Sequence, residues 1–283
     1  MRIPLQRKIF GRVLTILCIA CVVAIVLPLL WVMWDVAGQG FSSLSIPTFL
    51  NTRFPPPGRD LTDGAYGFGH ALVGSLLVLG IAAALSFPFG VLAAVYLAEF
   101  GRGTRLAYLV KFSCNVLTGV PAIISGLFAY AILVRNSGFS AYSGGVALGV
   151  LMLPIVIRST EEALFLVPLE LRQGAIGIGS TRFQSTMRIV LPAAAPAIVT
   201  GLILSLARAT GEAAPLLFTA FNNVAFSLDI RGAVATLPVM IYTFAKQPYE
   251  AQRELAWAAS LVLLAIVLSV SLLSRFVVGR QKR

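Results

Sequence analysis

Residues 72–98 read LVGSLLVLGIAAALSFPFGVLAAVYLA, a stretch of 27 residues without a charged side chain. A helix needs about 20 apolar residues to cross the hydrocarbon core of a bilayer, so this stretch predicts a transmembrane helix. Other mostly apolar stretches lie on both sides of it, at 13–34, 107–134, 144–166, 193–221 and 255–273. The sequence therefore predicts an all-α, polytopic membrane protein with about six transmembrane helices, the third of which is interrupted by Pro121.

The composition indicates that lipid surrounds most of the chain. Hydrophobic residues make up 58% of the 283 residues and charged residues only 12%, whereas soluble domains carry about 25% charged residues. In a soluble protein, the formal net charge of +11 would suit a nucleic-acid partner. Here the Lys and Arg residues fall mainly in short segments between apolar stretches, which is typical of cytoplasmic membrane loops. We therefore expect membrane lipid as a partner and no nucleic acid.

The start of the chain is basic, like a signal peptide, but the apolar stretch that follows is too long for one and lacks a cleavage site of small residues. We therefore expect an uncleaved first transmembrane helix at 13–34. The break at Pro55-Pro56-Pro57-Gly58 predicts a loop, with room for a short helix. The predicted organisation is a cytoplasmic N-tail (1–12), the first helix (13–34), an extracytoplasmic loop (35–69), a transmembrane domain (70–277) with a cytoplasmic loop at 167–190, and a cytoplasmic C-tail (278–283).

The distribution of positive charge predicts the orientation. With the N-terminus inside, the inner segments hold 14 Lys or Arg residues and the outer segments hold 6. Lys and Arg are concentrated in the cytoplasmic loops of membrane proteins. We therefore expect both termini in the cytoplasm.

Arg208 is the positive charge that lies deepest in a predicted helix. It follows Pro192 by 16 residues, which is roughly 24 Å along a helix, so it lies inside the hydrocarbon region and must face a cavity, a partner or an anion. Gly201, Ser205, Arg208 and Glu212 share one helix face by spacing. A planar guanidinium suits a tetrahedral oxyanion, so we interpret this face as a substrate path. The alternative is a structural ion pair between Arg208 and Glu212.

Other polar residues inside the apolar stretches are weaker candidates. Ser125 follows the break at Pro121, where freed backbone groups can face the path. Arg158, Glu161 and Glu162 lie where the fourth helix leaves the membrane, so they either anchor the helix end at the interface or form a gate. We expect the amine of Lys111 to extend to the membrane interface.

Several kinds of site are absent from the sequence. Cys18 and Cys21 form a C-x-x-C pattern without a second ligand pair, and His70 is the only histidine, so we expect no metal site. The sequence has no GxxxxGK[ST] phosphate loop, so the chain does not bind ATP by that route. It also lacks the motifs of an intramembrane hydrolase. We therefore expect no cofactor and no catalytic site.

The most specific pattern lies in the 167–190 loop. It reads Gln173-Gly174-Ala175, then Gly179, then Ile189-Val190-Leu191-Pro192. This resembles the E-A-A-x3-G-x9-I-x-L-P loop of binding-protein-dependent ABC permeases, which docks on an ATPase, although Gln173-Gly174 replaces Glu-Ala. The resemblance implies the coupling residues Gln173, Gly174, Ala175, Gly179, Ile189, Leu191 and Pro192. The alternative is an amphipathic helix lying on the bilayer.

Two further segments narrow the family. Gly119-Val120-Pro121-Ala122-Ile123-Ile124-Ser125-Gly126-Leu127-Phe128 resembles the G-x-P-S-I-x-x-G-L-F segment of phosphate permeases. Arg208-Ala209-Thr210-Gly211-Glu212-Ala213-Ala214-Pro215-Leu216-Leu217-Phe218-Thr219-Ala220 is similar to a segment of one permease subunit of phosphate importers.

This resemblance implies a type I ABC importer permease fold in a bacterial inner or plasma membrane, with inorganic phosphate as the substrate. It also implies a second permease subunit, an ATPase dimer that binds ATP and Mg, and an extracytoplasmic phosphate-binding protein. The remaining alternatives are a permease for another oxyanion, such as sulfate or molybdate, and a secondary anion carrier.

Overall fold

The structure, a computed structural model, describes residues 5–61 and 64–279, and the side chains of residues 10–61 and 64–274. Within these residues every regular element is a helix. Five helices are long and apolar enough to cross a membrane, and one bent pair adds a sixth crossing if it is counted as a single span. The predicted all-α fold with about six transmembrane helices is confirmed. Parts of the predicted tails, residues 1–4 and 280–283, lie outside the described residues.

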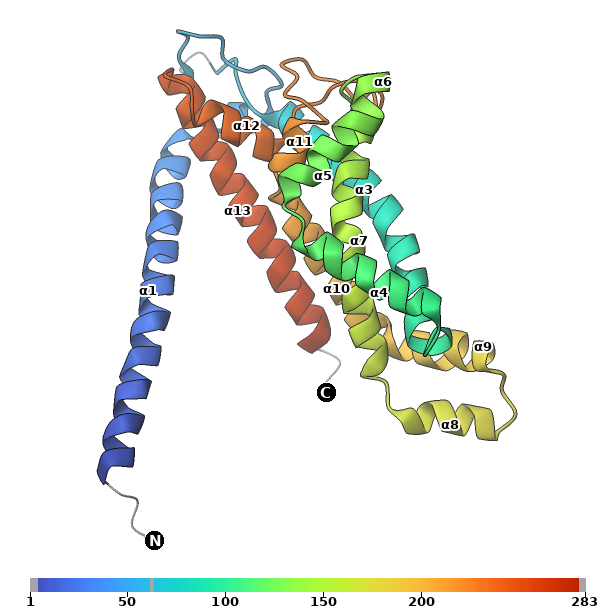
Figure 1. Ribbon diagram of the computed structural model, residues 1–283. Coiled ribbons are helices and arrows are strands. Elements are labelled where there is room, and N and C mark those ends of the chain that lie inside the picture. The colour runs from blue at the N-terminus through green and yellow to red at the C-terminus, as the bar shows by residue number, and fades with distance from the viewer. Residues whose placement is uncertain (1–4, 62–63, 280–283) are drawn as a thin grey trace.

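The first helix, α1 (Leu5–Ser43), stands apart from the other helices along most of its length (Figure 1). It meets α13 (Glu250–Gly279) near Gly40, where an added Cβ would lie 2.6 Å from the Cβ of Leu261. The helix continues past the predicted end at Trp34, and its last turns pack against α13. The predicted loop therefore begins only after Ser43, and it contains the short helix α2 (Ile46–Leu50).

The centre of the molecule is α7 (Ala141–Phe165), which packs between α3 (Gly69–Val95) and α10 (Leu191–Thr210). Small residues make these contacts close, since an added Cβ at Gly145 would lie 2.4 Å from Ile81 of α3, and one at Gly201 would lie 2.6 Å from Ser159 of α7. Small residues at such positions are typical of packed membrane helices.

The third crossing is broken, as the sequence predicts. It consists of α4 (Arg105–Gly119) and the run formed by α5 (Ala122–Ala129), η3 (Tyr130–Val134) and α6 (Arg135–Ser137), bent by 105°. Val120, before the proline, is extended (ψ 127°), as is Pro121 (ψ 136°). The proline ring disfavours a helical conformation in the preceding residue, so α4 ends there.

The fifth crossing corrects a prediction. The apolar stretch 193–221 predicts one continuous helix, but α10 ends at Thr210, with Gly211 as its cap, and the short helix α11 (Ala214–Leu217) follows. Glu212 therefore lies in the connection between the two helices. A helix end at Gly211 is favoured because glycine helix propensity is low, and Pro215 suits the first turn of a new helix.

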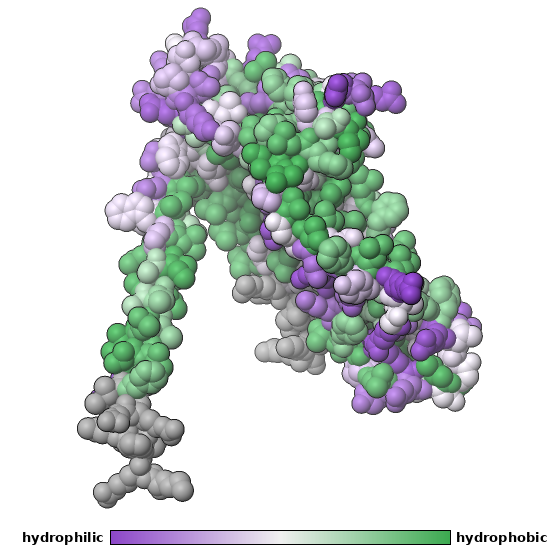
Figure 2. Space-filling model, in the orientation of Figure 1, coloured by the Kyte–Doolittle hydropathy of each residue, from purple (hydrophilic) through white to green (hydrophobic). Residues whose placement is uncertain are grey.

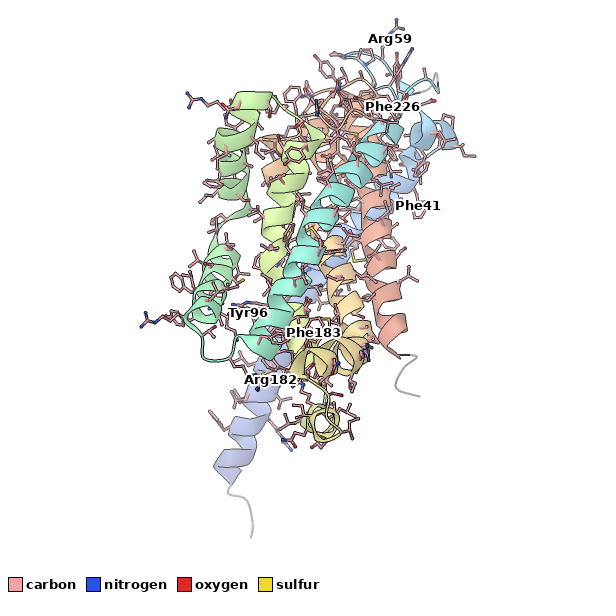
Figure 3. All side chains as sticks on the ribbon, turned by 90° about the vertical axis from the view of Figure 1, so that its right-hand side faces the viewer. Phe41, Arg59, Tyr96, Arg182, Phe183 and Phe226 are labelled. Atoms are coloured by element: carbon pink, nitrogen blue, oxygen red, sulfur yellow. The ribbon has the colours of Figure 1, made fainter. Side chains whose placement is uncertain are left out.

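The two ends of the molecule are polar and its middle is apolar (Figure 2). One end is here called the α8 end. It holds the start of α1 and the end of α13, together with α8 (Leu169–Gly177), α9 (Arg182–Ser185) and η4 (Thr186–Val190) (Figure 1). The opposite, α12 end holds α2, α6, α11 and α12 (Leu237–Phe244). Arg182 and Phe183 lie at the α8 end, whereas Arg59 and Phe226 lie at the α12 end (Figure 3).

Candidate functional site

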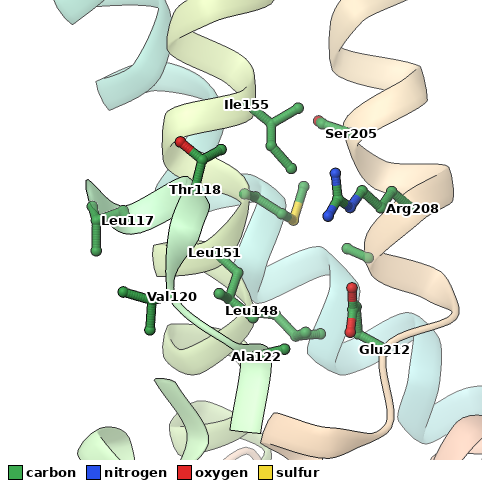
Figure 4. Close-up of a pocket in the computed structure, with 12 residues that line it drawn as sticks. Leu117, Thr118, Val120, Ala122, Leu148, Leu151, Ile155, Ser205, Arg208 and Glu212 are labelled. Atoms are coloured by element: carbon green, nitrogen blue, oxygen red, sulfur yellow. The ribbon is translucent and has the colours of Figure 1, made fainter. Parts of the chain in front are cut away.

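A cavity of about 80 Å³ lies between the broken third crossing, α7 and the end of α10. Three residues of the predicted path, Ser205, Arg208 and Glu212, line one side of it (Figure 4). The opposite sides come from α7 and from the α4–α5 break, and consist of Leu148, Leu151, Met152, Ile155, Leu117, Thr118, Val120 and Ala122. The structure therefore brings these three predicted residues to one cavity inside the membrane-crossing part of the chain.

Arg208 and Glu212 both point into this cavity without forming an ion pair (Figure 4). In the part of the chain whose side chains are described, the salt bridges are Lys111–Glu161 and Arg172–Glu99. Because α10 ends at Thr210, Glu212 does not take the helical position four residues after Arg208 that an intrahelical pair requires. Arg208 remains exposed, so its guanidinium is open to a ligand in the cavity.

The two serines of the predicted path have local partners. Ser205 is buried, and its hydroxyl donates to the carbonyl oxygen of Leu202 at 2.7 Å. Ser125 does not line the cavity; its hydroxyl donates across to α7, to the carbonyl oxygen of Ala147 at 3.5 Å. In this conformation both hydroxyl protons are engaged within the protein, and a serine would have to rotate to donate to a ligand.

The broken third crossing and the α10–α11 segment meet next to the cavity. An added Cβ at Gly126 would lie 2.6 Å from the Cα of Pro215. Gly126 belongs to the segment 119–128 and Pro215 to the segment 208–220, the two stretches that resemble phosphate permeases. Their contact joins α5 to α11 close to Ala122 and Glu212, which line the cavity.

A second cavity, of about 290 Å³, lies nearer the α8 end, between α4 and α7. It contains Arg158 and Glu162, the predicted gate residues, together with Glu161. Arg158 donates to the side-chain oxygen of Asn115. The amine of Lys111 contacts a carboxylate oxygen of Glu161 at 2.6 Å, so it pairs with α7, and its extension to the membrane interface stays a prediction.

One face of α7 lines both cavities. Leu148, Leu151 and Ile155 face the first cavity, and Arg158 and Glu162 face the second, at alternating spacings of three and four residues. Residues at these spacings share a helix face. The two cavities therefore follow one another along the α4–α7 groove.

Sequence reasoning missed the α4 side of this groove. Lys111 and Asn115 face the second cavity and Thr118 the first. The signal was present, since these polar residues recur at i, i+4 and i+7 in an otherwise apolar helix.

The predicted coupling residues lie at the α8 end. Gln173 and Gly174 are exposed on α8, and Ala175 is buried against the bundle. Gly179 has φ +90°, which only glycine adopts readily, and it makes the turn toward α9. Ile189 and Leu191 are half-buried in η4 and at the start of α10, and Pro192 is exposed.

The same loop exposes large apolar side chains. Ile176, Ile178 and Phe183 are 50%, 83% and 62% exposed. They lie on α8, in the turn and on α9, at a polar end of the molecule. Exposed apolar groups that gather in one loop are typical of a protein interaction site.

Comparison with known proteins places the chain in a family. The model of the binding-protein-dependent transport system inner membrane component family matches residues 86–283. The phosphate transport system permease protein PstA of Yersinia pestis is 36% identical over 98% of this chain and 92% of its own length. PstA of Haemophilus influenzae is 37% identical over 89% of this chain and 88% of its own length.

Solved structures share the fold. A bacterial alginate ABC transporter, in complex with its alginate-bound periplasmic protein, has a chain that matches with a TM-score of 0.68 and 16% identity, over 99% of this chain and 98% of that one. An inward-facing MetNI methionine ABC transporter matches with a TM-score of 0.60 and 19% identity, over 74% of this chain and 94% of that one. The chain is thus a multi-pass transport component rather than an enzyme, and it belongs to the family of binding-protein-dependent transport system inner membrane components, among the phosphate permeases of the PstA type.

Proposed function

We propose that the protein is one permease half of an ATP-driven importer that moves inorganic phosphate into the cytoplasm. The observation that carries this proposal is Arg208, which lies in a membrane-embedded cavity without a carboxylate partner. The chain around it is similar, over nearly its full length, to permeases named for phosphate transport.

Placing the charged side chain of Arg208 within a membrane costs free energy. A charged Arg near the centre of a bilayer costs at least about 2.5 kcal/mol, and a cavity with a passing anion reduces that cost. The guanidinium offers several donors in a fixed plane, which match phosphate oxygens. Glu212, on the same cavity, would repel the anion and keep its binding weak enough for release.

The path continues toward the α8 end. From the Arg208 cavity, phosphate would follow the α4–α7 groove into the cavity that holds Arg158 and Glu162. There the contacts of α7 with α4, Lys111–Glu161 and Arg158–Asn115, would have to part for a wide opening. We assign Arg158 and Glu162 to the inner gate.

Energy would come from another chain. The sequence contains no GxxxxGK[ST] loop, so ATP and Mg would bind to a partner ATPase dimer. The exposed apolar residues Ile176, Ile178 and Phe183 suit docking into its groove. The 167–190 loop would follow the ATPase as it closes, and the helices would rock between inward- and outward-facing states.

The remaining partners lie in and outside the membrane. A second permease would cover the open side of the Arg208 cavity, and an extracytoplasmic phosphate-binding protein would dock at the α12 end. The α8 end and both termini would then face the cytoplasm, in the inner or plasma membrane of a bacterium. The distribution of Lys and Arg supports this orientation.

Uptake of radioactive phosphate by the complete complex in lipid vesicles tests the substrate. We expect unlabelled arsenate, which has the same shape and protonation as phosphate, to reduce the uptake. Sulfate, which carries no proton at neutral pH, should leave it unchanged. Equal competition by sulfate would overturn phosphate as the preferred substrate and favour a general oxyanion permease.

A further inference from the structure

The α8 helix is attached to the rest of the protein by few apolar contacts. Among its nine residues, Leu169–Gly177, only Ala175 is buried. The larger apolar side chains of the helix, such as Leu169 and Ile176, are half exposed. The burial of one alanine holds α8 only weakly to the rest of the protein, although the helix is to move with a partner protein.

A single arginine supplies a stronger connection. The side chain of Arg172, at the middle of α8, is only 12% exposed. Its Nη2 atom lies 3.1 Å from a carboxylate oxygen of Glu99, and it also donates to the carbonyl oxygen of Leu164 at 2.5 Å. Arg172 therefore joins α8 to two other helices at once.

These two acceptors lie at the ends of membrane-crossing helices. Glu99 belongs to η2 (Tyr96–Phe100), the continuation of α3, and its side chain is also 12% exposed. Leu164 lies in the last turn of α7, and its carbonyl oxygen also accepts from the backbone N–H of Val167 at 3.3 Å. The arginine thus adds a side-chain donor at the end of α7 and supplies a countercharge to Glu99.

The ends of α3–η2 and α7 pack together as one unit. The buried side chains of Ala98, Leu164 and Val190 belong to one apolar core at this end. The guanidinium of Arg102 also lies over the ring of Phe165, 5.6 Å from its centre. A force applied to either Glu99 or Leu164 would move this unit as a whole.

We propose that Arg172 and Glu99 are positioning residues of the coupling between the ATPase and the transmembrane helices. Their ion pair holds α8 to the ends of α3–η2 and α7, so that a displacement of α8 becomes a displacement of both helices. Most exposed ion pairs contribute little because water screens them; this pair is largely shielded from water. The proposal rests on the proposed function.

The direct test measures phosphate transported per ATP hydrolysed by the reconstituted complex. Glu99→Gln removes the charge from the pair and keeps the size of the side chain. We expect ATP hydrolysis to continue while the transport ratio falls about fivefold or more, the scale of typical coupling between sites. The matched control is Glu170→Gln, an exposed acid on α8 outside the described salt bridges, which should keep the wild-type ratio.

Two further variants keep the test decisive if Glu99→Gln assembles poorly. The double variant Glu99→Gln/Arg172→Gln leaves no uncompensated buried charge, and it should assemble and yet be uncoupled. Arg172→Lys keeps the charge but replaces the planar guanidinium, whose Nη2 atom contacts both acceptors, with an ammonium group, and it should give an intermediate ratio. A wild-type ratio in the double variant would overturn the proposal.

A distance measurement separates this proposal from the identity of the substrate. Spin labels would be placed at the exposed positions Gly177, on α8, and Leu92, on α3, after replacement of the native cysteines. We expect the distance between them to stay constant when ATP is added to the wild-type complex and to change in the double variant. An unchanged distance in both would overturn the link, whereas absence of phosphate transport by the wild-type complex would overturn only the proposed function.

Discussion

Arg208 shows what a single residue can and cannot reveal in the sequence. A permanent charge within an apolar stretch predicts a cavity or a partner, and the structure does place Arg208 in a cavity. The spacing also predicts a shared helix face with Glu212, which is wrong because α10 ends at Thr210. The cavity forms across three segments of the chain, and no local pattern contains that information.

The free guanidinium leads to the first prediction. Arg208→Gln should lower phosphate uptake by about 10- to 100-fold, since a hydrogen bond to a charged group contributes about 1.5–3 kcal/mol. Because Glu212 is not its ion-pair partner in the structure, the variant should assemble at wild-type levels. Uptake assays and copurification of the partner subunits measure the two effects.

The double variant Arg208→Gln/Glu212→Gln decides between an anion contact and a structural pair. If Arg208 contacts the anion, uptake stays low when both charges are removed. Recovery of assembly and uptake together would mean that the two residues form a structural pair.

The second prediction concerns the contact between Gly126 and Pro215. In Gly126→Val, a Cβ would lie 2.6 Å from the Cα of Pro215, so the α5 and α11 helices must separate. Overpacking of this kind costs about 1–3 kcal/mol, which should lower the Tm of the purified protein by several degrees.

Gly119→Val is the matched control, because an added Cβ at Gly119 has no neighbour within 4 Å. It should change the Tm little. Equal Tm values for the two variants would show that the Gly126–Pro215 contact is not tight.

At the scale of elements, apolar stretches predict which helices exist better than where they end. Pro121 marks the break between α4 and α5, because proline restricts both itself and its neighbour. The part of α1 beyond Trp34 packs instead against α13 around Gly40. A contact between residues so far apart in sequence leaves no periodic signal.

The 167–190 loop carries the third prediction. Gly179 has φ +90° and open space around it, so Gly179→Val is opposed by backbone strain rather than by a clash. Left-handed conformations cost other residues about 1–2 kcal/mol, and β-branched residues more. We expect the turn to shift, so that ATP hydrolysis continues while phosphate transported per ATP decreases.

Gly177→Val serves as the control, because Gly177 also has open space but has no positive φ. It should transport at nearly the wild-type ratio. Normal transport by Gly179→Val would show that the loop is only a surface helix.

At the scale of the whole molecule, the sequence predicts the membrane-crossing helices and their orientation. It does not predict which helices pack against one another. The positions of α7 between α3 and α10, and of α4 beside α7, are set by small residues and by ion pairs that join distant segments. Lys111 and Glu161 are an example, since each is unremarkable in its own segment.

Orientation gives the fourth prediction. A cysteine placed at Gln173, in a background without native cysteines, should react with a membrane-impermeant reagent only after the cells are opened. A cysteine at Arg135, near the α12 end, should react in intact cells. The distribution of Lys and Arg supports this arrangement. Labelling of Gln173→Cys in intact cells would reverse the assigned orientation.

The most direct test of the account measures accumulation of phosphate in vesicles that hold the complete complex with its ATPases facing inward. With binding protein and radioactive phosphate outside, phosphate should accumulate only when ATP is sealed inside, and omission of this protein should abolish accumulation. Uptake that needs no ATP and follows an ion gradient, or the same uptake without this protein, would contradict its assignment as a permease half of an ATP-driven phosphate importer.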